Sequence, residues 1–212
     1  MKPIRTLTAL AVPMDRANVD TDQIIPKQFL KRIERTGYGE FLFYDWRYTF
    51  APDAVEPNPE FVLNAPRYKG AEILIVGKNF GCGSSREHAA WALNDYGFRC
   101  VVGTTFADIF YSNAGKNGIL LCRLTEDEVN TLMARAANTP QYKLTVSLED
   151  QTVKDALGFS AHFDIDPFRK FCLLEGLDDI GLTLRHEAEL DKFEAAHDKE
   201  FWLKPKAANA IT

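Results

Sequence analysis

The sequence contains few of the residues from which proteins build metal sites. Its 212 residues include four cysteines and four histidines. No two cysteines have the C-x-x-C spacing of a metal-binding pair, and the histidines are scattered without the spacing of ligands. We therefore predict no metal site made by this chain alone.

An excess of positive charge is also missing. The 30 acidic residues outnumber the 25 basic ones, which gives a formal net charge of −5 at pH 7. Proteins that bind nucleic acids generally present a basic face to the phosphates. The charge balance therefore argues against a nucleic-acid partner.

Long apolar runs are absent as well. No run approaches the ~18 residues that a membrane-spanning helix needs. Residues 1–20 hold only a short apolar stretch that Pro13 and Asp15 interrupt, which is not the pattern of a signal peptide. We therefore expect a cytoplasmic protein without membrane contact. Disulfides are rare in that compartment, so we interpret Cys100 and Cys122, which lie in apolar runs, as small core residues.

The composition that remains is typical of a globular enzyme or binding domain. Apolar residues make up 46% of the chain and charged residues 26%, which is enough apolar material for a proper core. We predict a single domain over residues 1–190. A charged helical extension and tail would follow over residues 191–212, with the part after Trp202 frayed or disordered.

The most informative stretch is residues 72–97, EILIVGKNFGCGSSREHAAWALNDYG. It opens with an apolar, mostly β-branched run at 73–76, which is typical of a buried strand. A loop with three glycines follows, and then Ser84 and Glu87 have the Ser-x-x-Glu spacing of a helix capping box. Apolar residues at helical spacing continue to Gly97, which suits a helix end. We predict a strand, a glycine loop and a helix.

The predicted helix start would suit an anion. It presents unpaired N–H groups and partial positive charge, and Ser84, Ser85 and Arg86 add two hydroxyls and a guanidinium. The simplest ligands are a carboxylate or a phosphate. The alternative to a binding site is an ordinary strand-to-helix turn whose helix is capped by Ser84 and Glu87.

Two nucleotide-binding motifs do not fit this loop. After Gly81-x-Gly83, Arg86 stands where a dinucleotide fingerprint has its third glycine, and no Gly-Lys-Ser/Thr follows at the spacing of a P-loop. We interpret Cys82 as a small residue that suits a tight loop. A reactive thiol at a helix terminus is the alternative.

Three segments have amino-acid sequences that are more diagnostic of a family than the secondary structure predicted for them. They are GKNFGCGSSREHAAWAL at 77–93, NVDTDQIIPK at 18–27 and FADIFYSN at 106–113. Together they closely resemble the signature of the small, swivelling-domain subunit of 3-isopropylmalate dehydratase (isopropylmalate isomerase), in the aconitase superfamily. The order of the segments fits, and the resemblance covers roughly residues 1–190.

The resemblance implies a reaction shared between two subunits. The family isomerises 2-isopropylmalate and 3-isopropylmalate by dehydration and rehydration in leucine biosynthesis, with a [4Fe-4S] cluster as the Lewis acid for the leaving hydroxyl. That cluster would belong to a separate large subunit, and this chain would supply the opposite wall of the active site. By position, Ser84 matches the base that removes the carbon-bound proton. Ser85 and Arg86 match residues that hold a substrate carboxylate.

A serine base needs help, because a free hydroxyl is a very weak acid. Free N–H groups at the helix start and the Arg86 cation would stabilise the alkoxide. Ser84 cannot be both a base and a fully committed helix cap. We therefore expect a looser cap geometry, or a contribution from Ser85.

Two other functions stay open at this stage. A sister hydro-lyase, acting on citraconate/2-methylmalate or homoaconitate, would differ in the loop of residues 30–40. That loop includes most of a basic stretch (Lys27, Lys31, Arg32 and Arg35), and the resemblance places substrate choice there without giving a role to any one arginine. A stand-alone anion-binding module without chemistry is the other possibility.

The remaining patterns predict an α/β domain with mixed sheets, which the resemblance sharpens to the aconitase-like swivelling β/β/α fold. A turn is expected at 18–22, a densely aromatic core or partner surface at 41–50 and an irregular crossing at 52–68. Strands are expected at 4–12 (stopped by Pro13), 98–102, 119–122, 142–148, 151–155 and 159–165. Helices are expected at 107–114, 125–137, 168–175 and 182–196.

Overall fold

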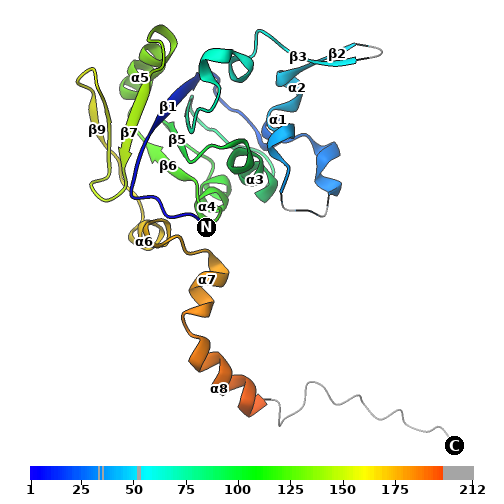
Figure 1. The fold of residues 1–212 in the computed structure, drawn as a ribbon, viewed down its shortest axis with the longest axis vertical. Helices are drawn as coiled ribbons and strands as arrows, with labels where there is room; N and C mark the ends of the chain where they lie inside the picture. Colours follow the sequence, from blue (N-terminus) through cyan, green and yellow to red (C-terminus); the bar gives the residue numbers. More distant parts are fainter. Residues whose placement is uncertain (33, 35, 52–53, 198–212) are drawn as a thin grey trace, which may run out of the picture.

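The computed structural model describes residues 1–32, 34, 36–51 and 54–197. Its centre is a seven-stranded mixed sheet with the order β6-β5-β4-β1-β7-β8-β9 (Figure 1). The strands are β1 (Thr6–Met14), β4 (Ile73–Val76), β5 (Cys100–Gly103), β6 (Leu120–Arg123), β7 (Lys143–Ser147), β8 (Thr152–Asp155) and β9 (Ser160–His162). The pairs from β6 to β1 are parallel, and those from β1 to β9 are antiparallel. The predicted α/β class with a mixed sheet is confirmed.

Helices cover both faces of the parallel half. Val12, Leu74 and Val101 point into one core, together with α3 (Glu87–Tyr96) and α4 (Asp108–Lys116). Their chain neighbours on the strands point into a second core, with α5 (Glu126–Asn138) and α6 (Pro167–Glu175). A sheet buried on both faces explains why these strands read as continuous apolar runs rather than as alternating ones.

Local signals place most of these elements correctly. Helix α5 opens with a capping box that its Thr-x-x-Glu sequence favours, with Thr125 accepting from the Glu128 N–H and Glu128 reaching back. Helix α6 begins at Pro167 and ends before Gly176, which has φ +70°. The predicted helix at 182–196 is in fact two helices, α7 (Asp179–Leu184) and α8 (Glu187–His197).

Strand β1 does not stop at Pro13, which corrects the expectation from the sequence. Pro13 is paired in register with Ile75 of β4. The Ala11 N–H donates toward the β7 side, to the carbonyl of Tyr142, and the backbone of Pro13 faces that same side. Pairing with β7 has already ended at Leu10, so the missing N–H of proline leaves no ladder bond unmade.

The segment between β1 and β4 wraps one end of the sheet. It contains α1 (Thr21–Ile24), α2 (Tyr44–Arg47), the hairpin of β2 (Tyr48–Ala51) and β3 (Ala54–Pro57), and 3-10 turns at Lys27–Lys31, Gly39–Phe41, Val62–Asn64 and Pro66–Tyr68. The hairpin projects at the upper right of Figure 1. Part of the aromatic run belongs to the core, since Phe43 is fully buried, whereas Phe50 is 57% exposed and a partner surface there stays a prediction. The crossing expected at 52–68 is less irregular than predicted, because β3 and two 3-10 turns form within it.

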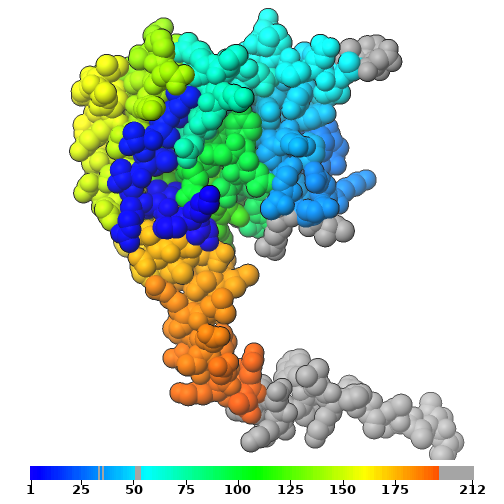
Figure 2. Space-filling view, in the orientation of Figure 1, coloured from blue at the N-terminus to red at the C-terminus, as the bar shows by residue number. Residues whose placement is uncertain are grey.

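The C-terminal helices α7 and α8 lead away from the main body (Figures 1 and 2). The boundary that we predict at residue 190 lies within α8 and stays a prediction, and the tail after Trp202 lies outside the described residues. Within the described ranges, no helix is both long and apolar enough to cross a membrane.

Candidate active site

The three signature segments meet at the carboxyl ends of β1, β4 and β5. The loop after β4 forms a bridge with the loop after β1, at Asp20 and Cys82, and another with the loop after β5, at Phe80 and Phe106. Backbone bonds fix both joins: the Gly81 N–H donates to the Val19 carbonyl at 2.7 Å, and the Phe80 N–H donates to the Thr105 carbonyl at 3.1 Å. The carboxyl edge of parallel strands is where open α/β sheets bind ligands.

Two glycines of the loop are required by close packing. Gly81 has φ +78°, and a Cβ there would lie 2.2 Å from Cγ of Phe110 in α4. At Gly77 a Cβ would lie 2.6 Å from the carbonyl oxygen of Arg16, in the loop after β1. These glycines let the neighbouring segments approach within contact distance.

The predicted capping box at Ser84 and Glu87 is wrong. Helix α3 begins at Glu87, its N-cap residue is Arg86, and no side chain caps it. Within the described chain, the Glu87 carboxylate accepts instead from Nδ2 of Asn117 at 3.0 Å. The Ser84 carbonyl accepts from the Thr21 hydroxyl at 2.9 Å. Arg86 keeps an extended backbone, so the helix starts only after it, and the contact of Ser84 with the α1 segment outweighs the local preference for a cap.

A capping box forms instead where the sequence predicts only a turn. Asp20 caps α1, accepting from the Gln23 N–H at 2.8 Å, and the Gln23 side chain accepts from the Asp20 N–H at 3.0 Å. Pairing with Cys82 holds Asp20 in the extended conformation that a cap needs. Asp-x-x-Gln is a variant of the capping pattern, so this short helix could have been found from the sequence.

The three predicted site residues lie in the loop that leads into α3. Ser84 and Ser85 are exposed, and the Arg86 side chain is only 11% exposed. Nη1 of Arg86 donates to Oδ1 of Asp22 in an ion pair, and Nζ of Lys27 lies 3.9 Å from the other oxygen of that carboxylate. The predicted capping box would place Arg86 in the first turn of the helix. In the structure Arg86 is instead the N-cap residue.

Asp22 is the site residue that sequence reasoning missed. It lies in the NVDTDQIIPK segment, which the sequence identifies as a signature segment without giving Asp22 a role. The side chains of Asp22, Lys27 and Arg86 together carry one net positive charge beside two exposed hydroxyls. This arrangement can orient a guanidinium and attract a carboxylate.

His88 lies next to this group. Burial lowers the pKa of His88 below its ordinary value, the Glu87 charge opposes this shift, and the Arg86 cation adds to it. The His88 ring contacts those of Tyr38 and Trp91, with centroids 5.3 and 4.6 Å apart. Through Tyr38, it helps to hold the end of the 30–40 loop against α3.

Arg32 of the basic stretch lies in that loop and is engaged in local contacts. The Arg32 guanidinium lies 5.2 Å from the centroid of the Phe41 ring, and its Nε lies 3.6 Å from the Glu34 carboxylate. Ile33 and Arg35 lie outside the described residues. The expectation that this loop sets substrate choice stays a prediction.

The cysteines do not fit an iron–sulfur cluster, which needs several thiolates around one point. Cys100 and Cys122 are buried within the sheet with their sulfurs 3.7 Å apart, and Cys172 is buried in α6. Burial, and then the Asp20 charge, raise the pKa of the Cys82 thiol, which favours its interpretation as a packing residue. In the part of the chain that the structure describes, no three potential metal ligands are grouped.

Comparison with known proteins adds independent information. Residues 1–127 match the family model of the Aconitase C-terminal domain, and residues 130–167 match one described as LeuD_N. Residues 179–206 match the model of the C-terminal domain of the 3-isopropylmalate dehydratase small subunit.

Among curated proteins, the chain is 66% identical over 212 residues to the 3-isopropylmalate dehydratase small subunit of Acidobacterium capsulatum, covering 100% of this chain and 98% of that one. It is 54% identical over 195 residues to the subunit of the same name from Brevibacillus brevis, covering 92% and 99%. A crystal structure titled 3-isopropylmalate dehydratase, from Methanocaldococcus jannaschii, superposes with a TM-score of 0.65 at 20% identity. That match covers 89% of this chain and 99% of the other, and it supports the fold alone.

Proposed function

Because the chain belongs to the family of 3-isopropylmalate dehydratase small subunits, we propose that the Ser84–Arg86 loop is its half of the active site. The enzyme is a hydro-lyase that isomerises 2-isopropylmalate and 3-isopropylmalate in leucine biosynthesis, and a small subunit implies a large-subunit partner. One observation carries the proposal about the site. The three signature segments converge on one edge, where Arg86 is oriented by Asp22 beside the exposed Ser84.

Ser84 is the base in this proposal. Its hydroxyl is free of any helix-capping duty, and the Thr21 hydroxyl holds its carbonyl in place. The Ser84 alkoxide needs a preorganised positive environment, which the neighbouring Arg86 cation and the start of α3 supply. A donor of this kind typically contributes ~2.7–4 kcal/mol in a transition state.

Arg86 and Ser85 hold a carboxylate of the substrate. A guanidinium has five N–H donors, and the contact with Asp22 uses Nη1. Asp22 can therefore fix the plane of the guanidinium while other donors grip both oxygens of a carboxylate. Binding of the carboxylate positions the carbon that loses its proton within reach of the Ser84 hydroxyl, as a proton transfer requires.

The [4Fe-4S] cluster belongs to the large subunit in our proposal, since no more than two cysteines of this chain lie close together. Ser84 and Ser85 are exposed on this chain, so the large subunit would close the site over them. A cytoplasmic location is part of the proposal. It suits a biosynthetic enzyme and rests on the sequence patterns described above.

Replacement of Ser84 by alanine in the reconstituted two-subunit enzyme tests the site. We expect Ser84→Ala to lose most of kcat while the two subunits still associate, because the change removes the proton acceptor and no structural contact. The exposed Ser160 on β9 provides the matched control, and Ser160→Ala should keep full activity. Near wild-type kcat for Ser84→Ala would refute Ser84 as the base.

A further inference from the structure

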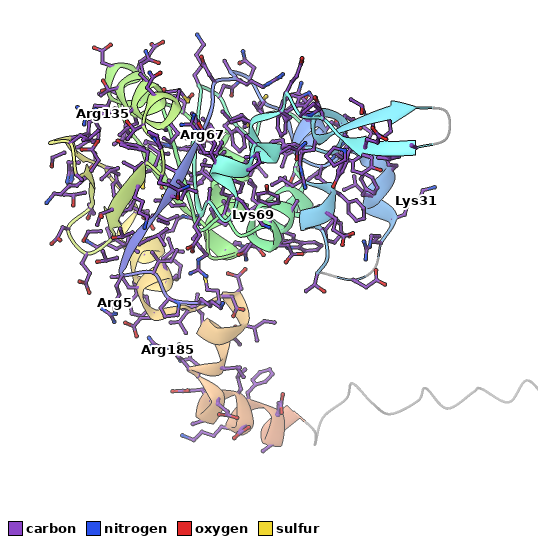
Figure 3. The ribbon with its side chains drawn as sticks, turned by 45° about the horizontal axis from the view of Figure 1, so that its top comes forward. Arg5, Lys31, Arg67, Lys69, Arg135 and Arg185 are labelled. Atoms are coloured by element: carbon purple, nitrogen blue, oxygen red, sulfur yellow. The ribbon has the colours of Figure 1, made fainter. Side chains whose placement is uncertain are left out.

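The two C-terminal helices form an arm, residues 177–197, that presents apolar side chains to solvent. Ile180 is 67% exposed and Leu184 is 56% exposed, one helical turn apart on α7. The arm extends from the rounded body in Figure 2, and Figure 3 shows Arg185 at the junction of its two helices. Phe168 and Phe171 on α6, at the base of the arm, are also exposed.

Helix α7 is anchored on one side only. Leu177 and Leu182 line a small cavity of about 70 Å³ against α4 and α6, whereas Ile180 and Leu184 are exposed. An isolated helix shorter than about 12 residues is marginal in water, and α7 has only six. An outward apolar face on such an element indicates that a partner covers it.

The charge of the arm indicates what kind of surface covers it. Residues 175–197, which are the arm and the two residues before it, contain seven acidic residues against two basic ones. This balance equals the net charge of −5 of the entire chain, so the remainder is nearly neutral. The complementary surface is an apolar groove with a basic rim.

The arm also begins beside the proposed active-site face. Asp179 at its start accepts from Nζ of Lys116 at 2.8 Å. A hollow of about 220 Å³ is lined by Asp178, Asp179 and Ile180 together with Glu87, the first residue of α3. A partner that closes the site over Ser84 would reach the root of the arm by continuing along this surface.

The family comparison divides the chain at the same point. The match to the Aconitase C-terminal domain covers residues 1–127, whereas the match to the C-terminal domain of the small subunit starts at residue 179, where α7 begins. A domain within a longer chain is held in place by its linker. A separate subunit must be held by contacts, and the arm lies beyond the aconitase match, in the part that matches the model of the small subunit's C-terminal domain.

We propose that the arm clasps the large subunit, with Ile180 and Leu184 seated in an apolar, basic-rimmed groove, and so holds the two halves of the active site together. This inference rests on the proposed two-subunit function. It assigns the arm to assembly and not to the chemical step.

The test is a double variant of the full chain, Ile180→Asp with Leu184→Asp, titrated against the large subunit by calorimetry. We expect its Kd to rise at least about tenfold, because two anchor side chains are lost and charge is introduced. The kcat at saturating large subunit should stay within about twofold of wild type, since the reacting groups are untouched. Leu157→Asp is the matched control, because Leu157 is 55% exposed in the β8–β9 turn, and its Kd should not change.

Other outcomes separate the possibilities. Unchanged Kd for the double variant, with an unchanged circular dichroism spectrum, overturns the proposal. Loss of self-association by the isolated chain with unchanged Kd overturns it in favour of a contact between two copies. A wild-type pair that associates but does not isomerise 2-isopropylmalate refutes the proposed function, while the comparison of Kd values still decides the role of the arm.

Discussion

At the scale of single residues, Arg86 is the most constrained member of the proposed site. Its guanidinium is nearly buried, yet it lies at the start of a helix, where the dipole disfavours a cation by roughly 0.3–1 kcal/mol. The ion pair with Asp22 offsets this cost. A bound carboxylate would add a second anion at the same place, so the position makes sense as a binding site.

Replacement of Arg86 by lysine should impair catalysis although the charge is kept. Lysine offers a compact ammonium on a flexible stem and cannot bridge Asp22 and a carboxylate with planar, paired bonds. We expect kcat/KM to fall about ten- to hundredfold, equivalent to the ~1.5–3 kcal/mol of a charged hydrogen bond.

Steady-state kinetics and thermal unfolding of the same variant separate binding from stability. Arg5→Lys is the control, because Arg5 is 59% exposed in a surface ion pair with Glu149, and it should be nearly silent. Unchanged kinetics with a lowered Tm for Arg86→Lys would show that Arg86 serves structure only.

At the scale of elements, a buried carboxylate joins α5 to the antiparallel half of the sheet. Asp155 at the end of β8 accepts from Nη1 of Arg135 at 2.6 Å and from the Tyr142 hydroxyl at 2.5 Å, and its side chain is fully buried. Figure 3 shows Arg135 on α5. Burial alone would raise the pKa of Asp155, but the bonds from Tyr142, Arg135 and two backbone N–H groups outweigh it and hold that pKa below its ordinary value.

Stability should therefore depend on pH through Asp155. Because the pKa is lowered in the folded state, the unfolded chain binds the proton first as pH falls. The stabilisation is complete above the ordinary pKa of about 3.9 and is lost below it. Asp155→Asn should lower the free energy of unfolding by about 1.5–3 kcal/mol at pH 7, and by less at pH 3.5.

Urea denaturation at the two pH values measures this difference. Asp164→Asn is the control, since the Asp164 side chain is fully exposed beside His162, and its effect should be small at both values. An equal loss of stability at pH 7 and pH 3.5 for Asp155→Asn would mean that its charge does not matter.

At the scale of the whole molecule, the proposed site is one wall of an active site. Its serines are exposed, and of its cysteines only Cys100 and Cys122 lie close together, buried within the sheet, which is too few thiolates for a cluster. We expect the isolated chain to show no isomerase activity, and to hold no stoichiometric iron or sulfide after anaerobic reconstitution. Addition of the large subunit should restore turnover. Stoichiometric cluster on the chain alone would contradict this division between the subunits.

Much of the fold could be predicted from the sequence, because its signals are local. The apolar run of β4, the capping box of α5, and the Pro167 and Gly176 limits of α6 each depend on a few neighbouring residues. The amino-acid sequence of residues 77–93 indicated the family, which the relatives confirm.

The geometry of the candidate site was decided by tertiary contacts. Ser84 and Glu87 have the spacing of a cap, yet the cap does not form, because Thr21, 63 residues away, binds the Ser84 carbonyl. Asp22 reaches Arg86 across 64 residues of chain, and Pro13 is tolerated because β7 has already ended beside it. The sequence by itself determined which elements form and which family they belong to. Only the folded chain decided which of two competing hydrogen-bond arrangements the loop adopts, because that choice depends on groups that approach it only when the sheet assembles.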